Sequence, residues 1–112
     1  MIHYEIKMTG GKHPVPLAVF EDGRYELAGT FLLAEARSFA DEIRTALDAV
    51  CAGKRESSTF SGNAFSLAVS ADKTIVTDDI RGEECVIGTR EFREVVEAYC
   101  RKWEACCRAW RR

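Results

Sequence analysis

The chain has 112 residues, of which 46% are hydrophobic and 30% are charged, and its formal net charge is −2 at pH 7. This length and composition are typical of one globular domain, and we expect residues 1–112 to fold as a single unit whose core needs no metal or disulfide. No apolar run approaches the roughly 18 residues of a membrane span, and the acidic balance is unlike that of a dedicated nucleic-acid-binding domain.

The first 23 residues predict a β-hairpin. Apolar and polar residues alternate at the start, with Ile2, Tyr4, Ile6 and Met8 on the apolar side. Residues 9–12 supply a turn, and residues 15–21 form the second predicted strand. Pro14 and Pro16 lack a backbone N–H, so this strand should lie at a sheet edge or carry a bulge. Residues 24–30 are ambiguous and allow a further short strand.

A helix is predicted from Leu32. Apolar residues recur there with the spacing of one helical face, at Leu33, Ala36, Phe39, Ala40, Ile43, Ala46, Leu47 and Val50. Thr30 is placed to cap its start, and Gly53 is placed to end it. A polar linker, residues 54–58, follows.

Three strands and a second helix are predicted in the rest of the chain. A long strand runs from about Thr59 to Ser70, with Gly62 and Asn63 as a bulge or kink, and residues 74–78 return after a tight turn. An exposed acidic loop, residues 79–83, leads into a short strand over 84–87. Thr89 is placed to cap the last helix, whose apolar stripe is Phe92, Val95, Val96, Tyr99, Trp103, Cys106 and Trp110.

The order of elements is therefore ββ-α-βββ-α. Short turns between consecutive strands indicate antiparallel pairing, and each helix has one apolar stripe. We therefore predict an α+β fold, a two-layer sandwich in which two helices pack on one face of an antiparallel sheet of about five strands.

The cysteines indicate a reducing compartment. Their number is odd, no C-x-x-C pair occurs, and the neighbours Cys106 and Cys107 could bridge only with strain. With two histidines in the whole chain, a zinc site has little to build on. The N-terminus begins directly as a strand, without the pattern of a signal peptide. We expect reduced thiols, no metal or cofactor, and a cytoplasmic protein.

Candidate chemistry is sparse. Residues 9–12 (TGGK) lack the spacing of a phosphate-binding loop. His3 and His13 are the side chains suited to acid–base work near neutral pH, and the pattern places both at the surface. Glu21, Asp22 and Glu26 fit no ion-binding loop. We therefore expect a protein that binds rather than an enzyme.

Charge is unevenly distributed. Residues 1–89 carry nine cations and fourteen anions, whereas residues 90–112 carry seven cations and four anions. The densest acidic stretch contains Asp72, Asp78, Asp79, Glu83 and Glu84, with Glu91 nearby. A solvated loop is the simplest interpretation. The functional interpretation is a patch complementary to a basic partner, with Glu21 and Asp22 as further contacts.

The basic end of the last helix allows an alternative function. Cations gather there at Arg101, Lys102, Arg108, Arg111 and Arg112, so the chain could be a small nucleic-acid-binding or regulatory domain that uses this helix. Trp103 and Trp110 nevertheless continue the apolar stripe, which favours a core or interface role over base stacking. A homodimer through this helix is a further possibility, and Trp110 is placed to lie in such a contact or in a contact with a partner.

Four short segments, in their order along the chain, resemble those of a protein family. They are residues 39–43 (FADEI), 60–64 (FSGNA), 70–78 (SADKTIVTD) and 87–92 (IGTREF). The family comprises the small bacterial immunity proteins of contact-dependent growth inhibition and related polymorphic toxin systems. The resemblance covers about residues 1–99, rests on order and spacing, and leaves residues 100–112 unmatched.

The resemblance implies a non-enzymatic, cytoplasmic inhibitor without a cofactor. Such proteins bind the C-terminal toxin domain delivered by a neighbouring cell, often a nuclease, and block its active site. Because immunity families diverge at their binding surfaces, the contact residues expected here, Asp72, Asp78, Asp79, Glu83, Glu84, Glu21 and Asp22, come from the charge pattern alone.

Overall fold

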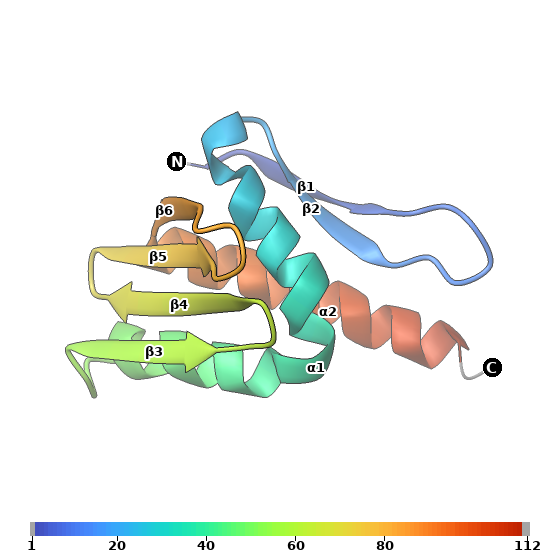
Figure 1. The fold of residues 1–112 in the computed structure, drawn as a ribbon. Coiled ribbons are helices and arrows are strands. Elements are labelled where there is room, and N and C mark those ends of the chain that lie inside the picture. The colour runs from blue at the N-terminus through green and yellow to red at the C-terminus, as the bar shows by residue number, and fades with distance from the viewer. Residues whose placement is uncertain (1, 111–112) are drawn as a thin grey trace.

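A computed structural model describes residues 2–110, without the side chain of Trp110 (Figure 1). Within that range the elements are β1 (Tyr4–Met8), β2 (Pro16–Phe20), the 3-10 turn η1 (Gly23–Tyr25), α1 (Glu26–Cys51), β3 (Ser57–Ser61), β4 (Phe65–Ser70), β5 (Lys73–Asp78), β6 (Glu84–Gly88) and α2 (Thr89–Trp110). The fold is α+β, as predicted, and its strand pairs are antiparallel.

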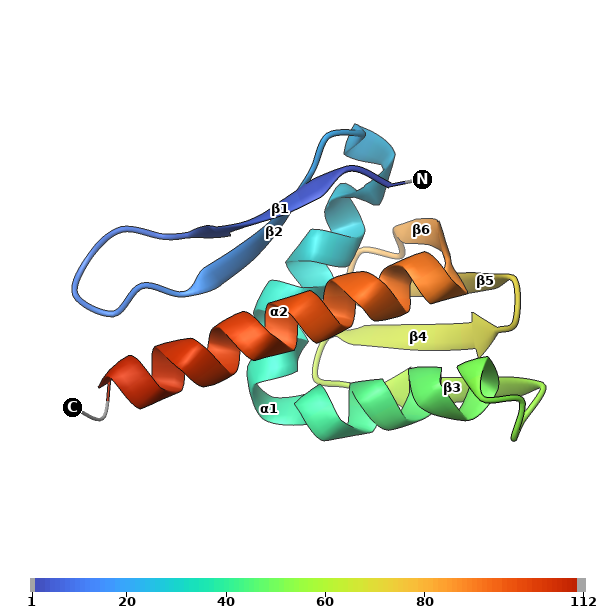
Figure 2. The same cartoon turned by 180° about the vertical axis from the view of Figure 1, so that it is seen from behind.

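The strands form two sheets. β3, β4, β5 and β6 make a four-stranded meander in that order. α2 and the second half of α1 lie behind it in Figure 1 and in front of it in Figure 2, and the first half of α1 runs past the ends of its strands. The prediction of two helices on one face is therefore confirmed for this sheet. β1 and β2 form a separate two-stranded sheet, which projects along the helices. The prediction of one sheet of about five strands was wrong in both strand number and continuity.

The hairpin is separate because helices occupy the outer edge of β2. Gly29 of α1 lies so close to this strand that a Cβ there would be 2.4 Å from the Ala18 carbonyl oxygen. The Tyr99 hydroxyl of α2 donates to the Pro16 carbonyl over 2.8 Å. Alternation in a sequence indicates which face of a strand is buried, but not what lies along its edge. The edge position expected from the prolines is confirmed.

Residues 62–64 form a turn rather than a bulge in one long strand. β3 ends at Ser61, and β4 runs back beside it with Ser61 paired to Ser66. The Gly62 N–H donates to the Phe65 carbonyl over 2.8 Å, which closes a tight hairpin. The long strand predicted from Thr59 is therefore two strands.

The first helix begins six residues earlier than Leu32, so the short strand allowed for residues 24–30 was wrong. The Asp22 carboxylate accepts a hydrogen bond from the Arg24 N–H over 3.0 Å and starts η1. Thr30 lies inside the helix and donates to the Glu26 carbonyl, so it is not the cap. Gly53 ends the helix with φ of 75°, as predicted.

The core lies between the helices and the four-stranded sheet. Phe31 is fully buried at its centre, with ring centroids 5.9–6.1 Å from those of Phe60, Phe65 and Phe92. The five cysteines, all within the described residues, are free, and Cys85, Cys100 and Cys106 are buried as small core side chains. Leu33, predicted for the core stripe, is instead 44% exposed.

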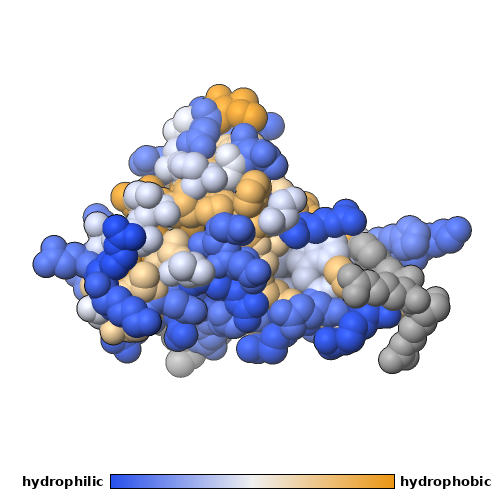
Figure 3. Space-filling view, turned by 90° about the horizontal axis from the view of Figure 1, so that it is seen from below, coloured by the Kyte–Doolittle hydropathy of each residue, from blue (hydrophilic) through white to orange (hydrophobic). Residues whose placement is uncertain are grey.

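The face of the molecule that lies at the bottom of Figure 1 exposes more hydrophilic than hydrophobic side chains. It carries β3 and the second half of α1, and Figure 3 shows it mostly hydrophilic around a smaller hydrophobic area.

The first helix bends at Phe39, where the backbone departs from helical geometry (φ −128°, ψ 24°). The Phe39 ring packs edge-on against Phe60, with ring centroids 5.5 Å apart. The bend thus allows one helix to cover both the meander and the hairpin.

The start of α2 is fastened to the sheet. Thr89 is buried, and its hydroxyl donates to the Ser70 carbonyl over 2.5 Å. It also lies 2.9 Å from the hydroxyl of the buried Thr74. Thr89 therefore begins the helix as predicted, but its side chain binds the sheet.

Farther along α2, a buried hydrogen-bonded chain joins the helix to the hairpin. The Trp103 indole N–H donates to the Tyr99 hydroxyl over 3.2 Å, and that hydroxyl donates onward to Pro16. The Arg37 guanidinium lies 5.6 Å from the centre of the Trp103 ring. Burial raises the pKa of Tyr99 to about 12. Trp103 is a core residue, because it is only 8% exposed and takes part in this chain of hydrogen bonds. The dimer or partner contact expected at Trp110 lies outside the described side chains.

Replacing Tyr99 with phenylalanine is expected to lower the free energy of unfolding by about 1–2 kcal/mol, because the indole N–H and the Pro16 carbonyl both lose a buried partner. The raised pKa means that the folded chain keeps the phenolic proton while the unfolded chain loses it above pH 10. The wild-type advantage should therefore be complete below pH 10 and shrink between pH 10 and about 12. Urea unfolding at neutral and alkaline pH measures both effects.

The half-buried Tyr25 offers a matched control. Tyr25→Phe should change stability by no more than about 0.5 kcal/mol. Equal losses in the Tyr25 and Tyr99 variants would show that the buried chain of hydrogen bonds does not stabilise the docked hairpin.

Candidate protein-binding site

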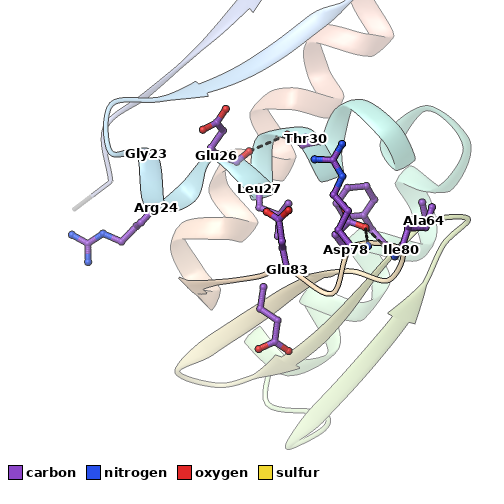
Figure 4. A pocket seen from close by; sticks show the side chains of 12 residues that line it. Gly23, Arg24, Glu26, Leu27, Thr30, Ala64, Asp78, Ile80 and Glu83 are labelled. Carbon is purple, nitrogen blue, oxygen red and sulfur yellow. Dashed lines mark hydrogen bonds between the residues drawn. The ribbon is translucent and has the colours of Figure 1, made fainter.

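A cleft of about 680 Å³ lies between the start of α1 and the β5–β6 loop (Figure 4). Three segments that are distant in sequence line it, namely Gly23, Arg24, Glu26, Leu27 and Thr30, then Ala64 and Phe65, then Asp78, Ile80, Arg81, Glu83 and Glu84. Its size falls within the range of ordinary ligand pockets. The predicted acidic loop therefore forms one wall of a cleft.

The loop is shaped by its first carboxylate. Asp78 accepts hydrogen bonds from the N–H groups of Ile80 and Arg81, each over 3.0 Å. Its own N–H donates to the Glu83 carbonyl, and the Gly82 N–H returns to the Asp78 carbonyl, each over 2.8 Å. Gly82 has φ of 76°, which favours glycine. Asp78 thus holds the loop in shape.

The loop is attached to the neighbouring β3–β4 turn. The Asp79 N–H donates to the Ala64 carbonyl, and the Ser66 hydroxyl donates to the Asp79 carboxylate, each over 2.9 Å. The position of the acidic loop therefore depends on the position of the turn.

Glu35 of α1 holds the β3–β4 turn in place, and this residue is only 1% exposed. Its oxygens accept hydrogen bonds from the N–H groups of Asn63 and Ala64, each over 3.1 Å, and of Phe65 over 3.0 Å. Gly62 leaves room for this carboxylate, because a Cβ at position 62 would overlap it and displace the Glu35 side chain. A chain of contacts thus runs from Glu35 through the turn to the acidic loop.

Sequence reasoning missed Glu35. The signal was its spacing, since Glu35 lies three residues after the buried Leu32 and four after the buried Phe31, on the apolar stripe of α1. A charged residue on such a stripe needs a buried partner. What could not be read from the spacing was which backbone groups provide it.

The candidate residues divide into three groups. Asp78, Asp79, Glu83 and Glu84 lie together on the loop, and Glu21 and Asp22 adjoin its far wall at Gly23. Hydrogen bonds from the Arg24 N–H and guanidinium lower the pKa of Asp22. Asp72 lies at the other end of the six-residue β5, roughly 20 Å away along the strand. The structure therefore does not bring Asp72 to the cleft.

The cleft combines negative charge with an apolar projection. Four carboxylates and two guanidinium groups line it. Arg24 points away from the cavity in Figure 4, and its Nε lies 2.7 Å from the Asp22 carboxylate. Ile80 at the rim is 81% exposed. This arrangement can accept cationic side chains and cover an apolar one.

The other candidate groups lie away from the cleft. His3 and His13 are exposed on the hairpin. Among residues 2–110, no cluster of three His, Cys, Asp or Glu side chains is placed to hold a metal. Arg101, Lys102 and Arg108 are exposed on α2, but the nearby Trp103 is buried and so not free to stack on a base.

In the described part, neither helix is long and apolar enough to cross a membrane. Comparison of the chain with protein-family models, with curated proteins and with solved structures finds no match.

Proposed function

We propose that this chain is a bacterial immunity protein that binds and blocks the C-terminal domain of a cognate toxin in the cytoplasm, without catalysing a reaction. The observation that carries the proposal is the acidic cleft with the exposed Ile80 at its rim. The best-fitting class of toxin is a basic nuclease.

Charge complementarity supports this class of partner. A nuclease binds phosphates through a positively charged surface. Carboxylates arranged on a rigid rim attract such a surface, speed the encounter and disfavour acidic partners. An apolar side chain that becomes covered on binding supplies affinity that charge alone does not. The β5–β6 loop combines both features, because it presents the exposed Ile80 among its carboxylates.

The resemblance to immunity proteins supports the same function. Two of its segments meet at the cleft, because residues 60–64 include the β3–β4 turn and residues 70–78 end at Asp78. A third, residues 39–43, belongs to the helix that holds this turn through Glu35. Three of the four segments that carry the resemblance therefore belong to the cleft or to the helix that supports it.

The test reverses charge at Glu83 and Glu84, which are exposed, rather than at Asp78 and Asp79, whose carboxylates shape the loop. Against the purified C-terminal nuclease domain of a toxin whose gene directly precedes the gene for this chain, Glu83→Lys with Glu84→Lys should weaken binding by about tenfold or more. Most of the loss should be in the association rate, and the salt dependence should fall. Surface plasmon resonance at several salt concentrations measures this.

Glu56→Lys, at an exposed residue in the linker before β3, is the matched control and should bind as the wild type does. Wild-type affinity in the double variant would remove the cleft from the contact. A wild-type protein that neither binds nor neutralises the adjacent toxin would overturn the immunity function.

A further inference from the structure

A second cavity, of about 270 Å³, lies beside the acidic cleft, between β2 and α1. Its walls are mainly apolar, with Leu17, Val19 and Phe20 on the strand side and Gly29, Thr30 and Leu33 on the helix side. Val19 is 40% exposed and Leu33 is 44% exposed. We call this cavity the apolar groove.

The groove results from the close crossing at Gly29. Because Gly29 has no side chain, the β2 backbone lies directly on α1 there. Leu33 follows Gly29 by one helical turn and therefore stands on the same side of the helix. Val19 neighbours Ala18, the residue whose carbonyl touches Gly29. Two large apolar side chains are thereby held apart at the surface with space between them.

The groove and the acidic cleft are parts of one surface. Gly23, Glu26 and Thr30 line both cavities. Glu26 and Thr30 are four residues apart, on one face of the first turns of α1, and form the ridge between the cavities. A typical partner covers about 800 Å² on each side of an interface, so a protein seated in the cleft also reaches the groove.

We propose that the apolar groove receives a large apolar side chain from the toxin domain, carried on a segment whose neighbouring residues are Lys or Arg. This inference rests on the proposed function and specifies its partner. The charges select the occupant, because Glu26 stands on the ridge and Asp78, Glu83 and Glu84 lie beyond it. Basic residues beside the apolar one would face these carboxylates.

The same charges disfavour a second copy of this chain. A two-fold contact places the same patch on both sides of the interface. Glu26 and the cleft carboxylates of one copy would then face those of the other, and like charges brought together at an interface cost several kcal/mol. A basic partner meets the apolar groove without this repulsion.

The groove and the cleft should act on different rate constants. Exposed charges mainly set the association rate, whereas buried contacts mainly set dissociation. Truncating the groove walls should therefore shorten the lifetime of the complex while leaving its formation unchanged.

The experiment compares Val19→Ala with Leu33→Ala, singly and together, by surface plasmon resonance with the purified toxin domain. Met8→Ala and Val86→Ala are the controls, since Met8 and Val86 are 41% and 52% exposed and line neither cavity. The double groove variant should dissociate about tenfold faster or more, with an unchanged association rate. The controls should match the wild type, and circular dichroism verifies that every variant is folded.

Wild-type dissociation in the double groove variant would overturn the inference. If the Glu83 and Glu84 reversals still weaken binding in that case, the immunity function stands and only the groove is excluded. If the wild type does not bind the toxin domain, the proposed function itself fails. Equal acceleration in the Met8 and Val86 variants would also overturn the inference, because the loss would not be specific to the groove.

Discussion

Replacing Glu35 with alanine is expected to lower the free energy of unfolding by about 3–4 kcal/mol, since an unsatisfied buried group costs about 1–3 kcal/mol and three N–H groups lose an acceptor. The expected loss is smaller than three full penalties, because Asn63 is exposed and Ala64 is half-buried, so water can reach their N–H groups. Phe65 is 5% exposed, and its N–H would be left without an acceptor. Urea unfolding followed by circular dichroism measures the loss.

Two variants separate the hydrogen bonds from the general effect of a change in α1. Glu35→Gln keeps one acceptor oxygen but turns an NH₂ group toward backbone donors, so its loss should lie between those of the wild type and Glu35→Ala. Glu42→Ala, at an exposed position of the same helix, should change stability by no more than about 0.5 kcal/mol. A loss below about 1 kcal/mol in Glu35→Ala would mean that water replaces the carboxylate without penalty.

Glu35 variants should also bind the toxin domain less tightly than the wild type does, even where they are fully folded. The carboxylate holds the turn, and the turn holds the acidic loop through the Asp79 N–H and the Ala64 carbonyl. At temperatures where the Glu35→Gln protein is fully folded, looser placement of the loop should reduce the association rate. Glu35 thus acts on the cleft by positioning the loop.

Local patterns were sufficient for much of this fold. β4 and β5 alternate in polarity around a tight turn, and α2 has a single apolar stripe, so each element is defined by neighbours in sequence. The acidic loop was also predictable, because its charges are contiguous and the structure brings Asp78, Asp79, Glu83 and Glu84 together.

The remaining features depend on contacts between distant residues. The Tyr99 hydroxyl meets a carbonyl 83 residues away, and the Glu35 carboxylate meets N–H groups 28 to 30 residues away. No periodicity encodes such pairs. They explain why the hairpin is a separate sheet and why Gly62 lies in a turn. Leu33 was predicted for the core because the spacing of apolar residues does not reveal that β2 crosses the helix at Gly29.

Replacing Gly29 with alanine is expected to lower the free energy of unfolding by about 2–3 kcal/mol, within the range of overpacked cores. In an ordinary helix the same change stabilises by about 1 kcal/mol, because alanine has the higher helix propensity. Here the new Cβ would lie 2.4 Å from the Ala18 carbonyl oxygen, a backbone atom that cannot rotate away. The steric term therefore outweighs propensity, and β2 must move off the helix.

Ala34→Gly provides the opposite control, since Ala34 is exposed in the same helix and should lose about 1 kcal/mol through propensity alone. Urea unfolding ranks the two variants, and hydrogen exchange at the β2 amides locates the change. A gain of stability in Gly29→Ala would show that the hairpin yields to the methyl group without penalty. If stability falls because the hairpin moves off the helix, the groove between Val19 and Leu33 changes shape, and Gly29→Ala should release the toxin domain faster than Ala34→Gly does. Destabilisation and faster release would then have one cause, the contact between Gly29 and Ala18.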